Sequence, residues 1–185
     1  MTDIPDEGAT LAWLAQAAGG EAEAGGAVSV SAETLAAYDL HSRLLYRLAL
    51  AEGRDAELAR DAVQEAFLRF YEARRSGQAI HSVRSWLAKV VINFIRDHAR
   101  RNSRLAAISE ASGAAAAEEA PGSAREFELR IRSLLSPREF DCVQLRLVGY
   151  KYHEIAEILG LRPGSVACLL SRALKKLEVL KGGAS

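Results

Sequence analysis

The sequence is poor in proline, cysteine, aromatic residues and net charge. Its 185 residues include four prolines and two cysteines, only 6% are aromatic, and the formal net charge is zero. Scarce proline together with abundant alanine, leucine, arginine and glutamate favours helices over strands. Cys142 and Cys168 have no CxxC partner, which argues against a disulfide framework or a zinc site and is typical of a cytoplasmic protein.

Long apolar runs and a secretion signal are also missing. No run approaches the roughly 20 apolar residues that cross a bilayer, and the opening MTDIPDEGATLAWLAQAAGG is acidic where a signal peptide is basic. We therefore expect a cytoplasmic protein with no membrane partner. Because 49% of the residues are apolar, the chain can form packed cores rather than remain disordered.

The zero net charge conceals a segregated pattern. Residues 1–33 contain six acidic residues and no Lys or Arg, whereas residues 84–104 contain six basic residues and one acidic residue. An acidic segment then precedes residues 129–185, which contain ten basic and five acidic residues. Two separate basic blocks are expected of a protein with two polyanion-binding surfaces, although solvated helix faces also produce such patterns.

Apolar spacing divides the chain into two helical domains. The acidic residues 1–32 are rich in Gly, Ala and Glu and predict a flexible extension, and helical periodicity then runs through residues 33–104. Residues 105–128 predict an acidic linker, which is followed by a second helical domain at residues 129–181. The predicted fold class is therefore all-α, with two small domains.

The helix predicted for DAELARDAVQEAFLRFYEARR has two distinct faces. At about 100° per residue, one face collects apolar side chains that we expect to be buried: Ala59, Val63, Ala66, Phe67 and Phe70. The opposite stripe consists of acidic and amide residues with one leucine: Asp61, Gln64, Glu65, Leu68 and Glu72. Solvation accounts for the charges but not for an exposed leucine, so the stripe indicates a protein contact.

The helix predicted for SVRSWLAKVVINFIRDHARR places a basic row opposite its apolar face. The residues expected to be buried are Val83, Leu87, Val90, Val91 and Phe94. The opposite side comprises an aromatic, an amide and three basic residues: Trp86, Lys89, Asn93, Arg96 and Arg100. These groups suit unstacked bases and phosphates. The alternative is that Trp86 belongs to the core.

The second domain has the pattern of a helix-turn-helix. Ser136, followed by proline and by Glu139, is typical of a capped helix start. Gly149 and Gly160 are placed as terminators of two successive helices, and Pro163 lies in the first turn of a third. A helix, a short glycine-containing turn and a second helix form the DNA-binding supersecondary unit, although helical hairpins without DNA function share this pattern.

These residues together resemble the extracytoplasmic-function (ECF) group of bacterial RNA polymerase sigma factors. RDAVQEAFLRFYE resembles the region-two helix that docks on the polymerase clamp, and SVRSWLAKVVINFIRDHARR resembles the adjoining promoter-melting helix. LSPREFDCVQLRLVGYKYHEIAEILGLRPGSV and LSRALKKL resemble region four, which recognises the minus-35 element. The likeness covers roughly residues 34–104 and 130–178. The resemblance implies a factor that directs promoter recognition and melting, with core RNA polymerase and promoter DNA as partners.

The resemblance also implies roles for particular residues. Polymerase binding would fall to Asp61, Gln64, Glu65 and Leu68. Contacts with the minus-10 element would fall to Trp86, Lys89, Asn93, Arg96 and Arg100, and the loop at residues 75–82 would capture an unstacked base through Gln78 and His81. Contacts with the minus-35 element would fall to Arg162, Ser165, Ala167, Cys168, Ser171, Arg172 and Lys175.

The likeness fails at the start of the last helix. The family usually has Val-Lys-Ser-Arg-Leu-Ser-Arg-Ala where this chain has VACLLSRA, so a Lys and an Arg are replaced by Ala167 and Leu169. We expect this helix to bury Val166, Leu170, Ala173, Leu174 and Leu177. One hypothesis is that the helix still recognises DNA, with an unusual preference. The alternative is a sigma-like adaptor whose Cys168 and Leu169 contact a protein, either an anti-sigma factor or the N-terminal extension.

Other functions have weaker support in the sequence. The four histidines, His41, His81, His98 and His153, have no metal-ligand spacing, and no phosphate-binding loop or nucleophile elbow is present. We therefore expect no enzyme activity, no metal and no cofactor. A stand-alone helix-turn-helix repressor would leave the acidic stripe unexplained. The N-terminal extension, with Trp13 and Leu14, either folds back over a basic face as an inhibitor or is a disordered tail.

Overall fold

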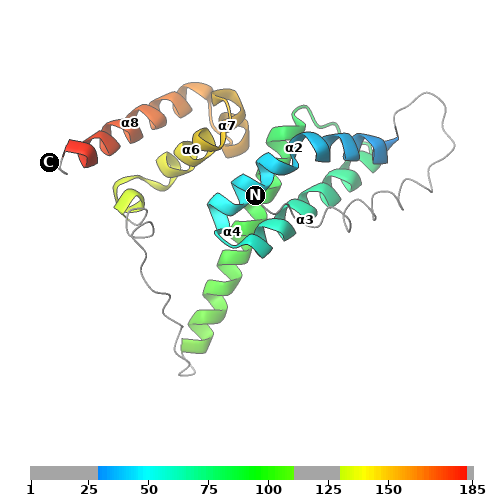
Figure 1. Ribbon diagram of the computed structural model, residues 1–185, viewed down its shortest axis with the longest axis horizontal. Coiled ribbons are helices and arrows are strands. Elements are labelled where there is room, and N and C mark those ends of the chain that lie inside the picture. Colours follow the sequence, from blue (N-terminus) through cyan, green and yellow to red (C-terminus); the bar gives the residue numbers. More distant parts are fainter. Residues whose placement is uncertain (1–28, 111–129, 183–185) are drawn as a thin grey trace, which may run out of the picture. The chain divides into compact units, whose positions relative to one another are not determined.

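The computed structural model describes residues 29–110 and 130–182, and these residues are helical with no strand among them. The helices with both ends in this part of the chain are α2 (Val30–Gly53), α3 (Ala56–Arg75), α4 (Val83–Glu110), α6 (Pro137–Val148), α7 (Tyr152–Leu159) and α8 (Pro163–Gly182) (Figure 1). They belong to two compact units that divide between Ala99 and Arg100. The all-α prediction is confirmed. Most of the predicted extension and linker, with Trp13 and Leu14, lies outside the described residues.

The first unit is built on a hairpin of α2 and α3. The hydroxyl of Ser29 accepts a hydrogen bond from the backbone N–H of Ala32 (3.1 Å), so α2 begins at Val30, slightly before the predicted domain start. The helix ends where Arg54 adopts a left-handed conformation (φ 57°). Immediately afterwards, the Asp55 carboxylate accepts from two backbone N–H groups and starts α3. The tight link makes α2 and α3 neighbours.

Close packing at Gly53 brings α4 onto this hairpin. A Cβ atom at Gly53 would lie 3.2 Å from the Ile95 side chain and 3.3 Å from that of Leu58, so a larger residue would push the helices apart. All five apolar residues predicted for the buried face of α3 are buried. Their rings and methyl groups, with Leu45 and Leu48 of α2, form the core of the unit.

The buried face of α4 differs from the prediction. Leu87 and Val91 are buried as expected, but Val83, Val90 and Phe94 are only half-buried. The rest of the core face is supplied by Ala88, Ile92 and Ile95. The face is thus turned by roughly a quarter-turn about the helix axis. The reason is that α4 contacts α2 through Ile95 at Gly53, a tertiary contact that periodicity within α4 does not encode.

Helix α6 of the second unit is capped as predicted. The Ser136 backbone N–H donates to the Glu139 carboxylate (2.8 Å) and the Glu139 N–H donates to the Ser136 hydroxyl (3.4 Å). Gly149 (φ 108°) ends α6 and Gly160 (φ 65°) ends α7, both in the left-handed conformation that glycine adopts without strain. Then α8 begins at Pro163. The predicted helix-turn-helix boundaries are confirmed.

The core of the second unit corrects one prediction about α8. Val166, Leu170 and Ala173 are buried, and Leu177 packs against the cluster formed with Leu135 and Phe140 of the adjoining segments. Leu174, however, is 58% exposed. Ala173 occupies the contact with α6, and the next residue projects about 100° further around the helix, away from that contact. Leu174 is therefore a surface residue and not a core residue.

Candidate nucleic-acid and protein interfaces

The predicted polymerase-binding residues form one surface on α3, the acidic stripe of Asp61, Gln64, Glu65 and Leu68. Asp61 and Gln64 are exposed, and Glu65 and Leu68 are half-buried. Glu65 accepts a hydrogen bond from the guanidinium of Arg69 one turn later (Nε–Oε1 2.7 Å), and the positive charge of Arg69 offsets part of the negative charge of Glu65. The stripe therefore presents an acid and an amide around a partly open leucine. Such a combination suits a protein contact better than a purely solvated face.

The predicted minus-10 residues form a second surface on α4, the basic stripe of Trp86, Lys89, Asn93, Arg96 and Arg100. They lie within roughly 80° around the helix, opposite the observed core face. Lys89, Asn93 and Arg100 are exposed. Trp86 is half-buried, with its ring centroid 6.0 Å from that of Phe70 in an edge-on contact. One side of the Trp86 ring therefore packs on the core, and the remainder is accessible.

Arg96 of this stripe forms an ion pair with a residue of another helix. Its Nε donates to Oε1 of Glu52 at the end of α2 (2.8 Å), and the Glu52 side chain is only 13% exposed. The ion pair joins α4 to α2 next to the close contact at Gly53. Sequence reasoning missed it, since the two residues are 44 positions apart and share no helix. Arg96 therefore presents a compensated charge, and Lys89 is exposed.

Hydrogen bonds hold the backbone at the start of the loop after α3, and several side chains of the loop are exposed. The N–H of Gly77 (φ 79°) donates to the Arg74 carbonyl (3.0 Å), and the N–H of Gln78 donates to the Ala73 carbonyl (2.9 Å), which together form a Schellman motif. The side chains of Gln78 and His81 are exposed. At the end of the loop, the Ser82 hydroxyl accepts from the N–H of Ser85 (3.3 Å) at the start of α4. Both predicted base-contacting side chains are thus accessible.

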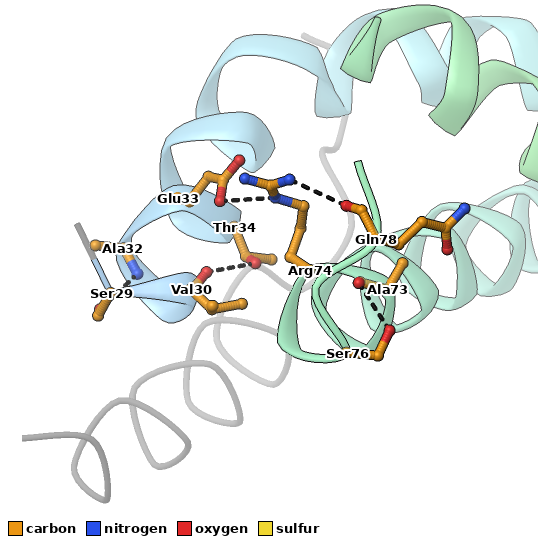
Figure 2. Close-up of polar contacts among 9 residues, drawn as sticks. All are labelled: Ser29, Val30, Ala32, Glu33, Thr34, Ala73, Arg74, Ser76 and Gln78. Carbon is orange, nitrogen blue, oxygen red and sulfur yellow. Dashed lines mark hydrogen bonds and ion pairs between the residues drawn. The ribbon is translucent and has the colours of Figure 1, made fainter. Parts of the chain in front are cut away.

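The loop is also held by a side chain. The guanidinium of Arg74 donates from Nε to Oε2 of Glu33 on α2 (2.9 Å) and from Nη1 to the backbone carbonyl of Gln78 (3.1 Å). Figure 2 shows this guanidinium between the first turn of α2 and the chain that leaves α3. Nothing in the local sequence pattern indicates these contacts, because Glu33 lies 41 residues before Arg74.

The exposed face of α8 carries the residues predicted for the minus-35 element. Every one is exposed: Arg162, Ser165, Ala167, Cys168, Ser171, Arg172 and Lys175. Leu169 is half-buried. Lys176 instead donates to the Glu139 carboxylate (2.7 Å), and this bond, with the Ser136 N–H, holds the pKa of Glu139 below its ordinary value. The face is basic at Arg162, just before α8 begins, and again at Arg172 and Lys175, with neutral residues between them.

The two cysteines are in opposite environments. Cys142 is fully buried in α6, and burial, with the nearby Asp141, raises the pKa of its thiol to about 11. Cys168 is exposed on α8. Within residues 29–110 and 130–182, no three His, Cys, Asp or Glu residues come together as metal ligands. In the same part of the chain, we find no helix long and apolar enough to span a membrane.

Comparison with known families accounts for both units. The family model for sigma-70 region 2 matches residues 37–105, and the family model for sigma-70 region 4 matches residues 130–177. The chain belongs to the sigma-70 family. The acidic stripe, the basic stripe and the loop at residues 75–82 all lie within the region-2 match, and the helix-turn-helix lies within the region-4 match.

Relatives place the chain in the ECF group. It is 28% identical over 144 residues to the ECF RNA polymerase sigma factor SigM of Mycobacterium tuberculosis, covering 77% of this chain and 74% of SigM. It is 26% identical over 141 residues to the ECF sigma factor EcfG of Rhodopseudomonas palustris, covering 74% of this chain and 78% of EcfG. This sigma factor therefore acts in transcription initiation, with core RNA polymerase and promoter DNA as its partners.

Solved structures share the fold. The sigma factor RpoE of Bartonella quintana, solved with the anti-sigma factor NepR, is 19% identical, with a TM-score of 0.56 over 83% of this chain and 96% of RpoE. CnrH, solved with the cytosolic domain of CnrY, is 23% identical, with a TM-score of 0.60 over 96% of this chain and 99% of CnrH. These likenesses support the fold and do not assign roles to individual residues.

Proposed function

We propose that this sigma factor divides its work among three surfaces. The acidic stripe on α3 binds core polymerase through Asp61, Gln64, Glu65 and Leu68. The basic stripe on α4, with the loop residues Gln78 and His81, binds and melts the minus-10 element. The exposed face of α8 contacts the minus-35 element. The observation that supports the proposal is that every residue of the three sets, chosen from sequence, is exposed or half-buried.

Melting by the basic stripe follows from its chemistry. Lys89 and Arg100 supply exposed positive charge for phosphates, and Asn93 supplies an amide that can hydrogen-bond a base edge. Trp86 is fixed on one side by Phe70, so its open part is a rigid platform on which a base can stack. Stacking and capture of an extruded base offset the few kcal/mol that unstacking costs. The protein needs no catalytic residue or cofactor for this work.

Binding to polymerase can be tested by charge reversal. We expect Asp61→Arg to reduce co-purification with core polymerase by about tenfold or more, because it reverses the charge of an exposed acid in the proposed contact. Asp39→Arg is the matched control, since Asp39 is exposed on α2 of the same unit. Equal binding by both variants and the unsubstituted chain would contradict the role of the acidic stripe.

Promoter melting can be tested in the same way. We expect Lys89→Glu to reduce permanganate reactivity of thymines at the minus-10 element in the assembled holoenzyme, while core binding persists. Arg43→Glu is the control, because Arg43 is an exposed base on α2 outside the stripe. Unchanged melting by Lys89→Glu would contradict the role of α4.

A second function has one observation in its favour. Leu174 is exposed on α8, about seven residues after Ala167 and therefore on the same side of the helix. An exposed leucine on a helix face suits a protein contact, as in a sigma-like adaptor. RpoE of Bartonella quintana was solved with an anti-sigma factor, and we extend an anti-sigma partner to this chain as a proposal. Anti-sigma binding that is lost on Leu174→Glu, in a chain that shows no minus-35 binding, would favour the adaptor.

A further inference from the structure

The guanidinium of Arg74 joins two segments that are distant in sequence. It donates to the Glu33 carboxylate in the first turn of α2 and to the carbonyl of Gln78 in the loop after α3 (Figure 2). Both members of the Glu33–Arg74 pair are about one-third exposed (32% each). A pair this open contributes little to global stability because water screens it. We therefore expect the Arg74 contacts to affect the position of the loop rather than the stability of the fold.

The Glu33 end of this contact is rigid. The Ser29 hydroxyl caps α2, and the Thr34 hydroxyl donates to the Val30 carbonyl (2.8 Å). Ser31 and Thr34 are fully buried, so the first turn cannot rotate without losing packing. The backbone that carries Glu33 is thus held in place.

The Gln78 end is the point at which the loop departs from α3. The N–H of Gln78 is held by the Ala73 carbonyl, and its own carbonyl is held by Arg74. With both backbone groups bound, the position of Gln78 at the start of the loop is set, while the side chains of Gln78 and His81 stay exposed. Holding the backbone of a contact residue while leaving its side chain open is how a binding site is preorganised.

We propose that Arg74 is a positioning residue that sets the base preference of the loop at residues 75–82. It does so by holding the Gln78 carbonyl against the first turn of α2, and it need not touch DNA. The inference rests on the proposed role of Gln78 and His81 in contacting a minus-10 base. A hydrogen bond from a charged donor is strong enough that its loss should reduce selectivity by about tenfold.

The test compares variants in holoenzyme made with the full chain. Transcription is measured from promoters that carry each of the four bases at each minus-10 position, and core binding and melting temperature are measured alongside. Arg74→Ala is expected to lower the ratio of best to worst base by about tenfold, with core binding unchanged. A uniform loss of output on all promoters, with the ratio preserved, would show a merely structural role and overturn the inference.

A charge swap separates the ion pair from the loop contact. Glu33→Arg combined with Arg74→Glu restores opposite charges, but a glutamate at position 74 cannot donate to the Gln78 carbonyl. We expect the swap to leave the base preference reduced, as in Arg74→Ala, and to change the melting temperature little. Recovery of the preference would contradict the inference, because the bond to Gln78 would then be unnecessary.

Failure of the underlying proposal gives a different result. If Gln78→Ala combined with His81→Ala leaves the base preference of the otherwise unchanged chain intact, the loop does not contact the base, and the role of Arg74 falls with it. If that double substitution flattens the preference while Arg74→Ala does not, only the positioning role is wrong.

Discussion

The contrast between the two cysteines gives a direct test of what the α8 face binds. Cys168 lies exposed in the middle of the predicted minus-35 face, whereas Cys142 is buried in α6. A bulky maleimide is the perturbation, because its attachment to Cys168 would both report access to the face and block it. Cys142 serves as an internal reference within the same unit.

The expected selectivity follows from burial and ionisation. With the Cys142 pKa raised to about 11, only about 0.03% of that thiol is ionised at pH 7.5, and the thiolate is the reactive form. Access to it also requires local opening of the second unit. We therefore expect one thiol per native chain to react rapidly and the second to react only after unfolding. The variants Cys168→Ser and Cys142→Ala identify which thiol has reacted.

The assay then adds partners in turn. If α8 contacts DNA, promoter DNA in a holoenzyme complex should slow the labelling of Cys168 at least tenfold, and labelling beforehand should abolish minus-35 binding. Labelling that proceeds at the same rate with and without promoter would refute the DNA-contacting role of this face. Rapid reaction of both thiols in the native chain would refute the packing described for α6.

Two further predictions concern the second unit. Ala167→Lys should restore one phosphate contact near the start of α8, so a plot of log DNA affinity against log salt concentration should become steeper by about 0.9. Anisotropy titrations would measure this slope, and Leu147→Lys on α6 is the equal-charge control. Glu139→Gln should lower the melting temperature at neutral pH. The pKa of Glu139 in the folded chain is lowered below its ordinary value of 4.5. The ionised carboxylate therefore stabilises the fold above pH 4.5, and this stabilisation is lost as the pH falls through the pKa of the folded chain. The difference between the Gln variant and the unsubstituted chain should therefore shrink in acid, and a pH-independent difference would contradict the assigned bonds.

The features predicted from sequence are those that one helix encodes by itself. The buried face of α3 and the caps at Ser136, Gly149 and Gly160 were predicted, because periodicity and terminal residues determine them locally. The core face of α4 was misjudged by about a quarter-turn because contact with Gly53, on another helix, decides it.

The features missed are contacts between distant segments. The pairs Arg96–Glu52 and Arg74–Glu33 each join residues more than 40 positions apart, so no pattern within one helix could indicate them. Leu174 was placed in the core because it lies near the apolar stripe, but Ala173 and Leu177 fill the contact with the neighbouring segments. In each case, packing between helices altered the environment of a residue whose helix had been predicted correctly.

The most direct test of the central claim is transcription in vitro from a library of randomised promoters, with core polymerase and the full chain. The three-surface account predicts products that share paired minus-35 and minus-10 sequences. It also predicts loss of the minus-10 preference on Lys89→Glu and loss of the minus-35 preference on Arg172→Ala combined with Lys175→Ala. Products that share only a minus-10 sequence, or an unaltered minus-35 preference in the α8 variant, would contradict it.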